Sequence, residues 1–68
     1  MIELYIDGST TGNPGPSGIG IFIKGEGHQI KISEFIGDQT NHVTEFIALQ
    51  RGLEEVSKLS PTIVSIRT

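Results

Sequence analysis

The sequence predicts an α/β fold with the element order βββαβ. In the first half of the chain, apolar and polar residues alternate in three separate segments, which is the pattern of half-buried strands. In the second half, apolar residues recur every three or four positions, and a short β-branched segment follows. With 68 residues, the chain holds one small domain or part of one. We expect a three-stranded antiparallel meander, then a helix, then a fourth strand parallel to the first.

The three predicted strands follow one another through turns. Residues 2–7 alternate, with Ile2, Leu4 and Ile6 on one face, and Asp7 closes the strand. Residues 19–24 alternate in the same way and form the second strand. A glycine-rich turn at residues 25–27 then leads into a third strand over residues 29–36.

The helical pattern begins near residue 43 and ends by residue 59. Its apolar positions are Val43, Phe46, Ile47, Leu49, Leu53, Val56 and Leu59. Thr40 or Asn41 can cap the first turn, and the Ser60-Pro61 step bars continuation of the helix. Residues 62–66 are β-branched and apolar, which predicts the fourth strand.

Composition and charge exclude several classes of protein. The absence of cysteine argues against a disulfide-stapled secreted protein and against thiolate metal ligands. No apolar run approaches the roughly 20 residues of a membrane helix, so we expect a cytoplasmic protein without a membrane partner. A net charge of −3 argues against nucleic-acid binding by bulk electrostatics, although carboxylates could still gather a divalent cation.

The segment from Gly8 to Gly20 holds five of the nine glycines and two of the three prolines, so we expect a loop at least through Pro16. The simplest interpretation is a hairpin turn, because Asp-Gly is a common turn dipeptide. A phosphate-binding loop is disfavoured, because the segment lacks a Gly-Lys-Ser/Thr ending and leads into a strand. The length of the segment instead favours a loop whose backbone approaches a ligand closely.

Two carboxylates stand at positions that could form a site. Asp7 ends the first strand, and Glu45 is expected in the first turn of the helix, where the helix dipole alone could explain it. If the start of the helix packs across the end of the first strand, the two carboxylates could share a hard cation such as Mg²⁺. His42 could equally be a surface or capping-loop residue.

A combination of motifs resembles the type 1 ribonuclease H family, including its reverse-transcriptase-like branch. The resemblance lies in the run at residues 4–9, the Gly12-Asn13-Pro14-Gly15-Pro16 run with Gly18, and Thr40-Asn41 with Glu45 and Leu49 in the helix. It implies a ribonuclease H-like fold with a mixed five-stranded sheet. It also implies hydrolysis of the RNA strand of RNA/DNA hybrids with two Mg²⁺ ions, for which Mn²⁺ could substitute.

The resemblance also implies roles for particular residues. Asp7 and Glu45 match the catalytic and metal-binding carboxylates of the family. The residues expected to contact the hybrid are Gly8, Ser9, Gly12, Asn13, Asn41 and His42, and His42 stands where the family often has asparagine.

The resemblance covers only the N-terminal part of one ribonuclease H-like domain, residues 1–68. The family's third carboxylate ends the fourth strand and is expected beyond Thr68, so we expect this chain alone to be inactive. A non-catalytic ribonuclease H-like module that binds nucleic acid or self-assembles is the main alternative, and a structural meander without a ligand is another. We also expect a homodimer through the edge of the fourth strand or the exposed face of the helix.

Overall fold

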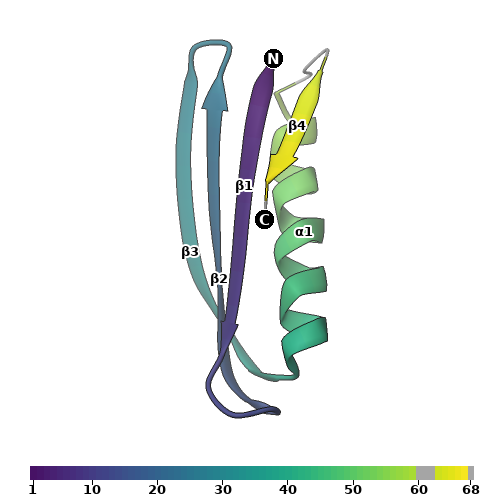
Figure 1. The fold of residues 1–68 in the computed structure, drawn as a ribbon. Coiled ribbons are helices and arrows are strands. Elements are labelled where there is room, and N and C mark those ends of the chain that lie inside the picture. The colour runs from purple at the N-terminus through teal and green to yellow at the C-terminus, as the bar shows by residue number, and fades with distance from the viewer. Residues whose placement is uncertain (60–62, 68) are drawn as a thin grey trace.

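The structure is a computed structural model that describes residues 1–59 and 63–67 (Figure 1). Its elements are β1 (Ile2–Thr10), β2 (Gly15–Gly25), β3 (His28–Gln39), α1 (Asn41–Ser57) and β4 (Val64–Arg67). The sheet order is β3-β2-β1-β4, with β1 antiparallel to β2 and parallel to β4. The predicted order βββαβ and the predicted strand directions are therefore confirmed. The fourth strand was expected over residues 62–66. Residue 62 lies outside the described residues, and Ile63 comes just before β4.

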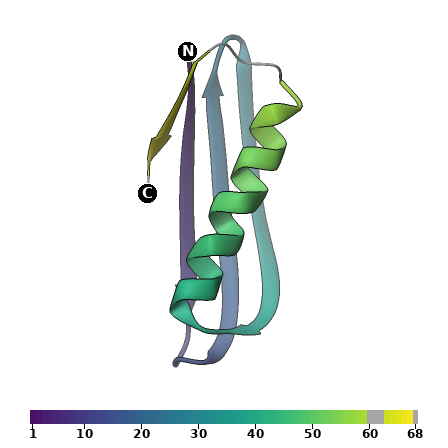
Figure 2. The same ribbon diagram turned by 90° about the vertical axis from the view of Figure 1, so that its right-hand side faces the viewer.

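The core lies between one face of the sheet and α1, which crosses that face in Figure 2. The alternation predicted for the first two strands is confirmed: Ile2, Leu4 and Ile6 of β1 are buried, as are Ile19, Ile21 and Ile23 of β2. The register pairs Leu4 with Ile23 and Ile6 with Ile21, so both strands present isoleucine and leucine to the helix. Among the described elements, none covers the opposite face of the sheet.

The face of α1 that contacts the sheet is made of small residues. The buried helix positions are Thr44, Ala48, Gly52 and Val56, which are four residues apart and so lie along one side of the helix. A Cβ atom at Gly52 would lie 3.0 Å from Cγ2 of Ile6 and 3.1 Å from Cδ1 of Leu4. The small side chains therefore let the helix approach the large residues of β1 closely.

The large apolar residues of α1 are covered by the sheet only in part. Of that set only Val56 is fully buried, whereas Val43, Phe46 and Leu53 are exposed by 42%, 64% and 42%. The reason is that the sheet already supplies bulky isoleucine and leucine side chains, and small helix residues fill the remaining space. No helix among the described residues is long and apolar enough to cross a membrane.

The loop expected from residue 8 is largely strand. β1 continues past Asp7 to Thr10, and its last residues pair with β2, for example Gly8 with Ile19 and Thr10 with Ser17. The connection is only residues 11–14, closed by a backbone hydrogen bond from Thr11 N–H to the Pro16 carbonyl at 2.9 Å. Glycine is compatible with a ladder whose hydrogen bonds come from the backbone, so glycine density alone did not mark a loop.

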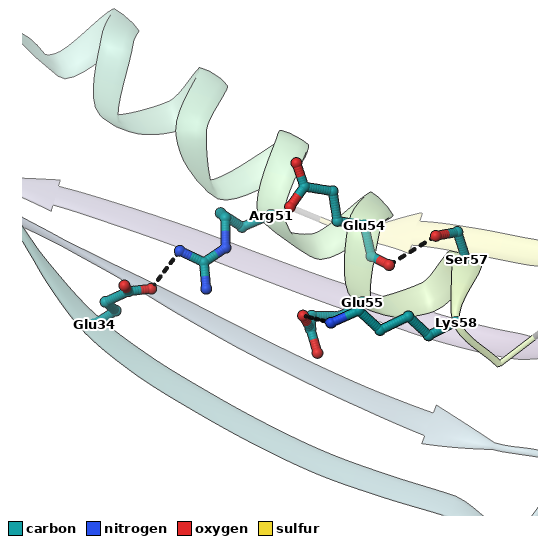
Figure 3. Close-up of polar contacts among 6 residues, drawn as sticks. All are labelled: Glu34, Arg51, Glu54, Glu55, Ser57 and Lys58. Atoms are coloured by element: carbon teal, nitrogen blue, oxygen red, sulfur yellow. Dashed lines mark hydrogen bonds and ion pairs between the residues drawn. The ribbon is translucent and has the colours of Figure 1, made fainter.

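Polar contacts join the second half of α1 to β3, and others lie within the helix near its C-terminal end (Figure 3). Arg51 Nη1 lies 2.6 Å from Glu34 Oε2, which ties the helix to the third strand. Lys58 pairs with Glu55 at 2.9 Å, and the Ser57 hydroxyl donates to the Glu54 carbonyl at 2.7 Å near the end of the helix. The helix ends at Ser57, two residues before the predicted limit.

Candidate functional site

Asp7 and Glu45 line one hollow between β1 and α1, with a volume of about 440 Å³. Gly8 and His42 line the same hollow, and apolar residues of the two elements complete its wall. Both carboxylates are solvent-exposed. The structure thus brings together four of the residues that the sequence singled out, two from the strand and two from the helix. We call this space the Asp7–Glu45 hollow.

Asp7 reaches this hollow from the edge of the sheet. Strand alternation places its side chain on the opposite face from Ile6, which points toward α1. The pairing of β1 with β4, however, ends at Tyr5 and Arg67. Among the described residues, no strand therefore lies beside Asp7 on the β4 side of β1. Asp7 also lines a second hollow on the open face, together with Ser9 and Gly18. It therefore lies at the rim between the two faces.

Glu45 lies just past the first turn of the helix, whereas a position within that turn was expected. The helix begins at Asn41 with Thr40 as its N-cap, and the Thr40 hydroxyl accepts a hydrogen bond from Val43 N–H at 3.3 Å. Glu45 is the fifth helical residue, and the first turn carries no acidic residue. The helix dipole, which acts mainly on the first turn, therefore does not account for Glu45.

A hydrogen bond joins Asn13 and Asn41, the two asparagines expected to contact substrate. The Asn41 backbone N–H donates to Asn13 Oδ1 at 3.0 Å. Gly12, just before Asn13, has a φ of +83°, a conformation that L side chains rarely adopt. The connection between β1 and β2 is thus held against the first residue of α1. Asn41 directly precedes His42, which lines the Asp7–Glu45 hollow.

Gly8 has a structural role that the sequence did not indicate. A Cβ atom built on it would lie 2.9 Å from Thr44 Cγ2 and 3.3 Å from the Thr44 carbonyl oxygen. The missing side chain therefore makes room for the helix, whereas the expected role was close approach to a ligand. Ser9 faces the hollow on the open side of the sheet and is not part of the Asp7–Glu45 hollow.

Three hydroxyl residues near the site were not anticipated. Thr44 and Ser17 are buried, and Thr10 is hydrogen-bonded to both of them. One signal was present in the sequence: Thr44 precedes Ala48, Gly52 and Val56 at intervals of four residues, which places it on the buried side of the helix. The hydrogen bonds of Thr10 with Ser17 and Thr44 depend on tertiary structure, so no local sequence pattern predicts them.

The donor set suits a hard divalent cation. Asp7 and Glu45 offer carboxylate oxygens, and Mg²⁺ typically uses one or two protein carboxylates, several waters and substrate phosphate oxygens. Residues 1–59 and 63–67 contain no group of three or more histidine, cysteine, aspartate or glutamate side chains that could hold a metal. A cation held by these two carboxylates would need water or substrate oxygens as its remaining ligands.

The Glu3 carboxyl, on the open face of the sheet, has a lowered pKa. The Tyr5 hydroxyl donates to Glu3 Oε2 at 3.1 Å, and Lys24 Nζ lies 3.4 Å from the same oxygen. The tyrosine hydrogen bond, followed by the lysine, lowers the pKa of Glu3 below its ordinary value of 4.5. This cluster stabilises the ionised carboxylate where β1 pairs with β2.

Comparison with known proteins gives a consistent result. The sequence matches the family described as RNase H over residues 1–68. A ribonuclease H from Pseudoalteromonas translucida is 37% identical over 67 residues, which cover 98% of this chain and 42% of that protein. A ribonuclease H from Desulforamulus reducens is 39% identical over 57 residues, which cover 84% of this chain and 36% of that protein.

Solved structures agree with the fold. LC11-RNase H1, solved in complex with an RNA/DNA hybrid, has a TM-score of 0.86 and 39% identity. It is matched over 97% of this chain and 52% of its own. An N-terminal RNase H domain from Mycobacterium tuberculosis has a TM-score of 0.87 and 31% identity, over 96% and 52% of the two chains. The chain therefore spans about half the length of these structures and less than half of the two curated relatives.

Proposed function

Because this chain belongs to the ribonuclease H family, we propose that the protein hydrolyses the RNA strand of RNA/DNA hybrids. The observation that carries the proposal is the Asp7–Glu45 hollow, which a strand residue and a helix residue with carboxylate side chains both line. A related RNase H1 that shares the fold was solved with an RNA/DNA hybrid. We propose this activity for the whole protein. The residues of the hollow would supply one part of its active site.

Asp7 and Glu45 are the proposed metal ligands and catalytic carboxylates. Bound divalent cations, Mg²⁺ or Mn²⁺, would activate a water molecule and stabilise the leaving oxygen of the scissile phosphate. The chain's own contribution is to hold the two carboxylates in one hollow from two different elements. Their negative charge concentrates cations where the phosphate must be neutralised.

The proposed substrate contacts come from residues around the hollow. Asn13 uses its side-chain oxygen to accept from Asn41 N–H, so its amide nitrogen remains as a donor toward a ligand. Asn41 and the backbone near Gly12 lie where the β1–β2 connection contacts the start of α1. Gly8 and His42 line the hollow itself. Ser9 faces the open side beside Asp7. Amide and backbone groups of this kind can read the 2′-hydroxyls that distinguish RNA from DNA.

A third carboxylate would complete the site. The parallel register pairs Tyr5 with Arg67, so a strand that continued in that register would bring the residue after Thr68 beside Asp7. The family resemblance expects an aspartate in that region. We propose that residues 1–68 alone do not support useful turnover, because they supply two of the ligands that a two-metal site requires.

A cleavage assay tests the proposed function. A labelled RNA/DNA hybrid with millimolar Mg²⁺ or Mn²⁺ should be cut by a protein whose reading frame extends beyond Thr68, and the 68-residue chain should cut it far more slowly. Asp7→Asn and Glu45→Gln should each remove cleavage by the longer protein. Glu54→Gln is the matched control, because Glu54 is an exposed residue of the same helix outside the hollow. Cleavage that survives Asp7→Asn would contradict the proposal.

A non-catalytic hybrid-binding module is the second candidate. It is favoured by the finding that the described part of the chain holds two carboxylates at the hollow and no cluster of three possible metal ligands. This candidate predicts that the longer protein binds the hybrid in a mobility-shift assay but leaves the RNA intact at every Mg²⁺ and Mn²⁺ concentration. Cleavage sensitive to Glu45→Gln would exclude it.

A further inference from the structure

The buried polar side chains identified in the described residues are Ser17 and Thr44, exposed by 3% and 1%. Both belong to one series of hydrogen bonds. Ser17 Oγ lies 2.8 Å from Thr10 Oγ1, and Thr10 Oγ1 lies 2.9 Å from Thr44 Oγ1. Ser17, Thr10 and Thr44 come from β2, β1 and α1, so we call the series the hydroxyl relay. Burial makes the relay consequential, because a buried hydroxyl without a partner is costly.

A backbone carbonyl stands at each end of the relay. The Thr44 hydroxyl lies 2.9 Å from the Thr40 carbonyl, and the Ser17 hydroxyl lies 2.9 Å from the Gly15 carbonyl. Each hydroxyl has one proton to donate. If Ser17 donates to Thr10, Thr10 donates to Thr44 and Thr44 donates to the Thr40 carbonyl. If Thr44 donates to Thr10, the direction reverses and ends on the Gly15 carbonyl.

All three protons are therefore used in either direction, and the backbone carbonyl at the other end of the relay then receives no hydroxyl proton. No hydroxyl is forced to face another without a proton between them, and bonds aligned in this way polarise one another. Removing the middle hydroxyl would interrupt both directions. Removing Ser17 would leave the route from Thr10 through Thr44 to the Thr40 carbonyl intact.

The relay joins the two parts of the molecule that carry the candidate site. Thr10 lies three residues after Asp7 on β1, and Thr44 directly precedes Glu45 on α1. Figures 1 and 2 both place the β1–β2 connection and the start of α1 at the same end of the molecule. Thr44 also packs its methyl group toward Gly8, which lines the hollow beside Asp7.

We propose that the hydroxyl relay fixes the start of α1 against β1 and thereby positions Glu45 relative to Asp7. This inference rests on the proposed function in one respect only, namely that the two carboxylates share a cation. Apolar packing between Gly8 and Thr44 sets the distance between helix and strand, but it is not directional. Hydrogen bonds are directional and fix the rotation and the shift of the helix along the strand. Thr10, Ser17 and Thr44 are thus positioning residues.

Two substitutions at Thr44 separate the hydroxyl from the methyl group. Thr44→Val keeps the branched shape and the methyl contact with Gly8 but removes the hydroxyl. Thr44→Ser keeps the hydroxyl and removes the methyl. Thr10→Val interrupts the relay at a partly buried position and provides a second route if Thr44→Val does not fold. Ser17→Ala is expected to disturb the helix least, because the Thr10–Thr44 link survives.

The first measurement is the orientation of residues 41–45 relative to β1, obtained from amide residual dipolar couplings of the 68-residue chain. Thr44→Val and Thr10→Val should alter the couplings of residues 41–45, whereas Thr44→Ser should retain those of the wild type. Each valine substitution should destabilise the fold and so raise the unfolding equilibrium constant about 5- to 30-fold. The two effects should be strongly non-additive in the double variant. Unchanged couplings in both valine variants, or fully additive effects, would overturn the inference.

Cation binding supplies the second measurement. Mn²⁺ titration should show weaker binding at Asp7 and Glu45 in Thr44→Val than in the wild type, and Thr44→Ser should restore the affinity. Equal affinity in wild type and Thr44→Val would overturn the positioning role. If the wild type binds no Mn²⁺ at these carboxylates, the cation-sharing part of the proposed function fails, and the couplings and the double-variant cycle still decide the relay.

Discussion

Gly8 shows how much of this site depends on a single absent side chain. The residue lines the Asp7–Glu45 hollow, and a Cβ atom added to it would lie only 2.9 Å from the Thr44 methyl carbon. The sequence pointed to Gly8 through its place in a family motif, but could not reveal this contact, because Thr44 lies 36 residues away in the chain. Asp7 and Glu45 were accessible from the sequence for a different reason: each belongs to a recognisable motif. Their chemical roles remain predictions.

Gly8→Ala should therefore destabilise the fold. The added methyl group would clash with a β-branched side chain and with backbone at 3.3 Å, and overpacking of this kind costs about 1–3 kcal/mol. Gly20→Ala is the control, since its Cβ atom would meet the nearest atom only at 4.0 Å, in ordinary contact. Urea unfolding of both variants measures the difference. Equal stability of the two variants would show that the helix does not approach β1 closely.

Glu3 predicts a pH dependence of stability. Its pKa is lowered in the folded state by Tyr5 and Lys24, so the folded state binds this proton less tightly than the unfolded state. The stabilisation is present above the ordinary pKa of 4.5 and is lost as the pH falls through the lowered value. Glu3→Gln should flatten the acid side of the stability profile, and Tyr5→Phe should flatten it in part. Denaturant unfolding from pH 7 to pH 3 measures this, and an identical acid limb in Glu3→Gln and wild type would contradict it.

At the level of elements, the helix was predicted more reliably than the face it uses. The spacing of apolar residues and the cap at Thr40 located α1 to within two residues at each end. The same apolar residues span more than one side of the helix and did not single out its contact face, because size and burial are inversely related here: Ala48 and Gly52 are buried against the sheet, while Phe46 is 64% exposed. The β1–β2 connection was predicted too long, because strand pairing of glycine is decided by backbone partners that local sequence does not specify.

Ala48→Leu tests the small-residue face. Ala48 is 1% exposed, so three additional carbon atoms should destabilise the fold by about 1–3 kcal/mol. Gln50→Leu introduces the same residue at an exposed position of the same helix and should change stability by about 0.5 kcal/mol or less. Thermal or denaturant unfolding distinguishes the two. A larger loss in Gln50→Leu than in Ala48→Leu would reverse the assignment of the face.

For the whole molecule, the order of the elements and the strand directions followed from the sequence, since alternation, helical spacing and the handedness of parallel connections constrain them strongly. What the sequence could not settle is how the exposed surfaces are covered. The outer side of α1 exposes Val43, Phe46 and Leu53, and β4 exposes Ile66 by 45%. A core of this size supplies only about 3–5 kcal/mol, so burial of further apolar surface would stabilise it appreciably.

The 68-residue chain is accordingly predicted to self-associate through the outer face of α1 or the edge of β4. Sedimentation across a concentration series should show an average mass that rises above that of one chain. Leu53→Glu should shift this rise to higher concentration, because it places a charge on the exposed apolar face. A well-folded monomer at every concentration would contradict the prediction.

The central claim is that Asp7 and Glu45 form one cation site, and paramagnetic broadening by Mn²⁺ tests it most directly. Gly8 and His42 line the hollow from the strand and the helix, so their amide signals report on its two sides. We predict that both signals broaden at the same Mn²⁺ concentration, and that Asp7→Asn and Glu45→Gln each reduce the broadening on both sides. Broadening of one signal alone, or loss of broadening only on the side that carries the substitution, would show two separate carboxylates and contradict the account.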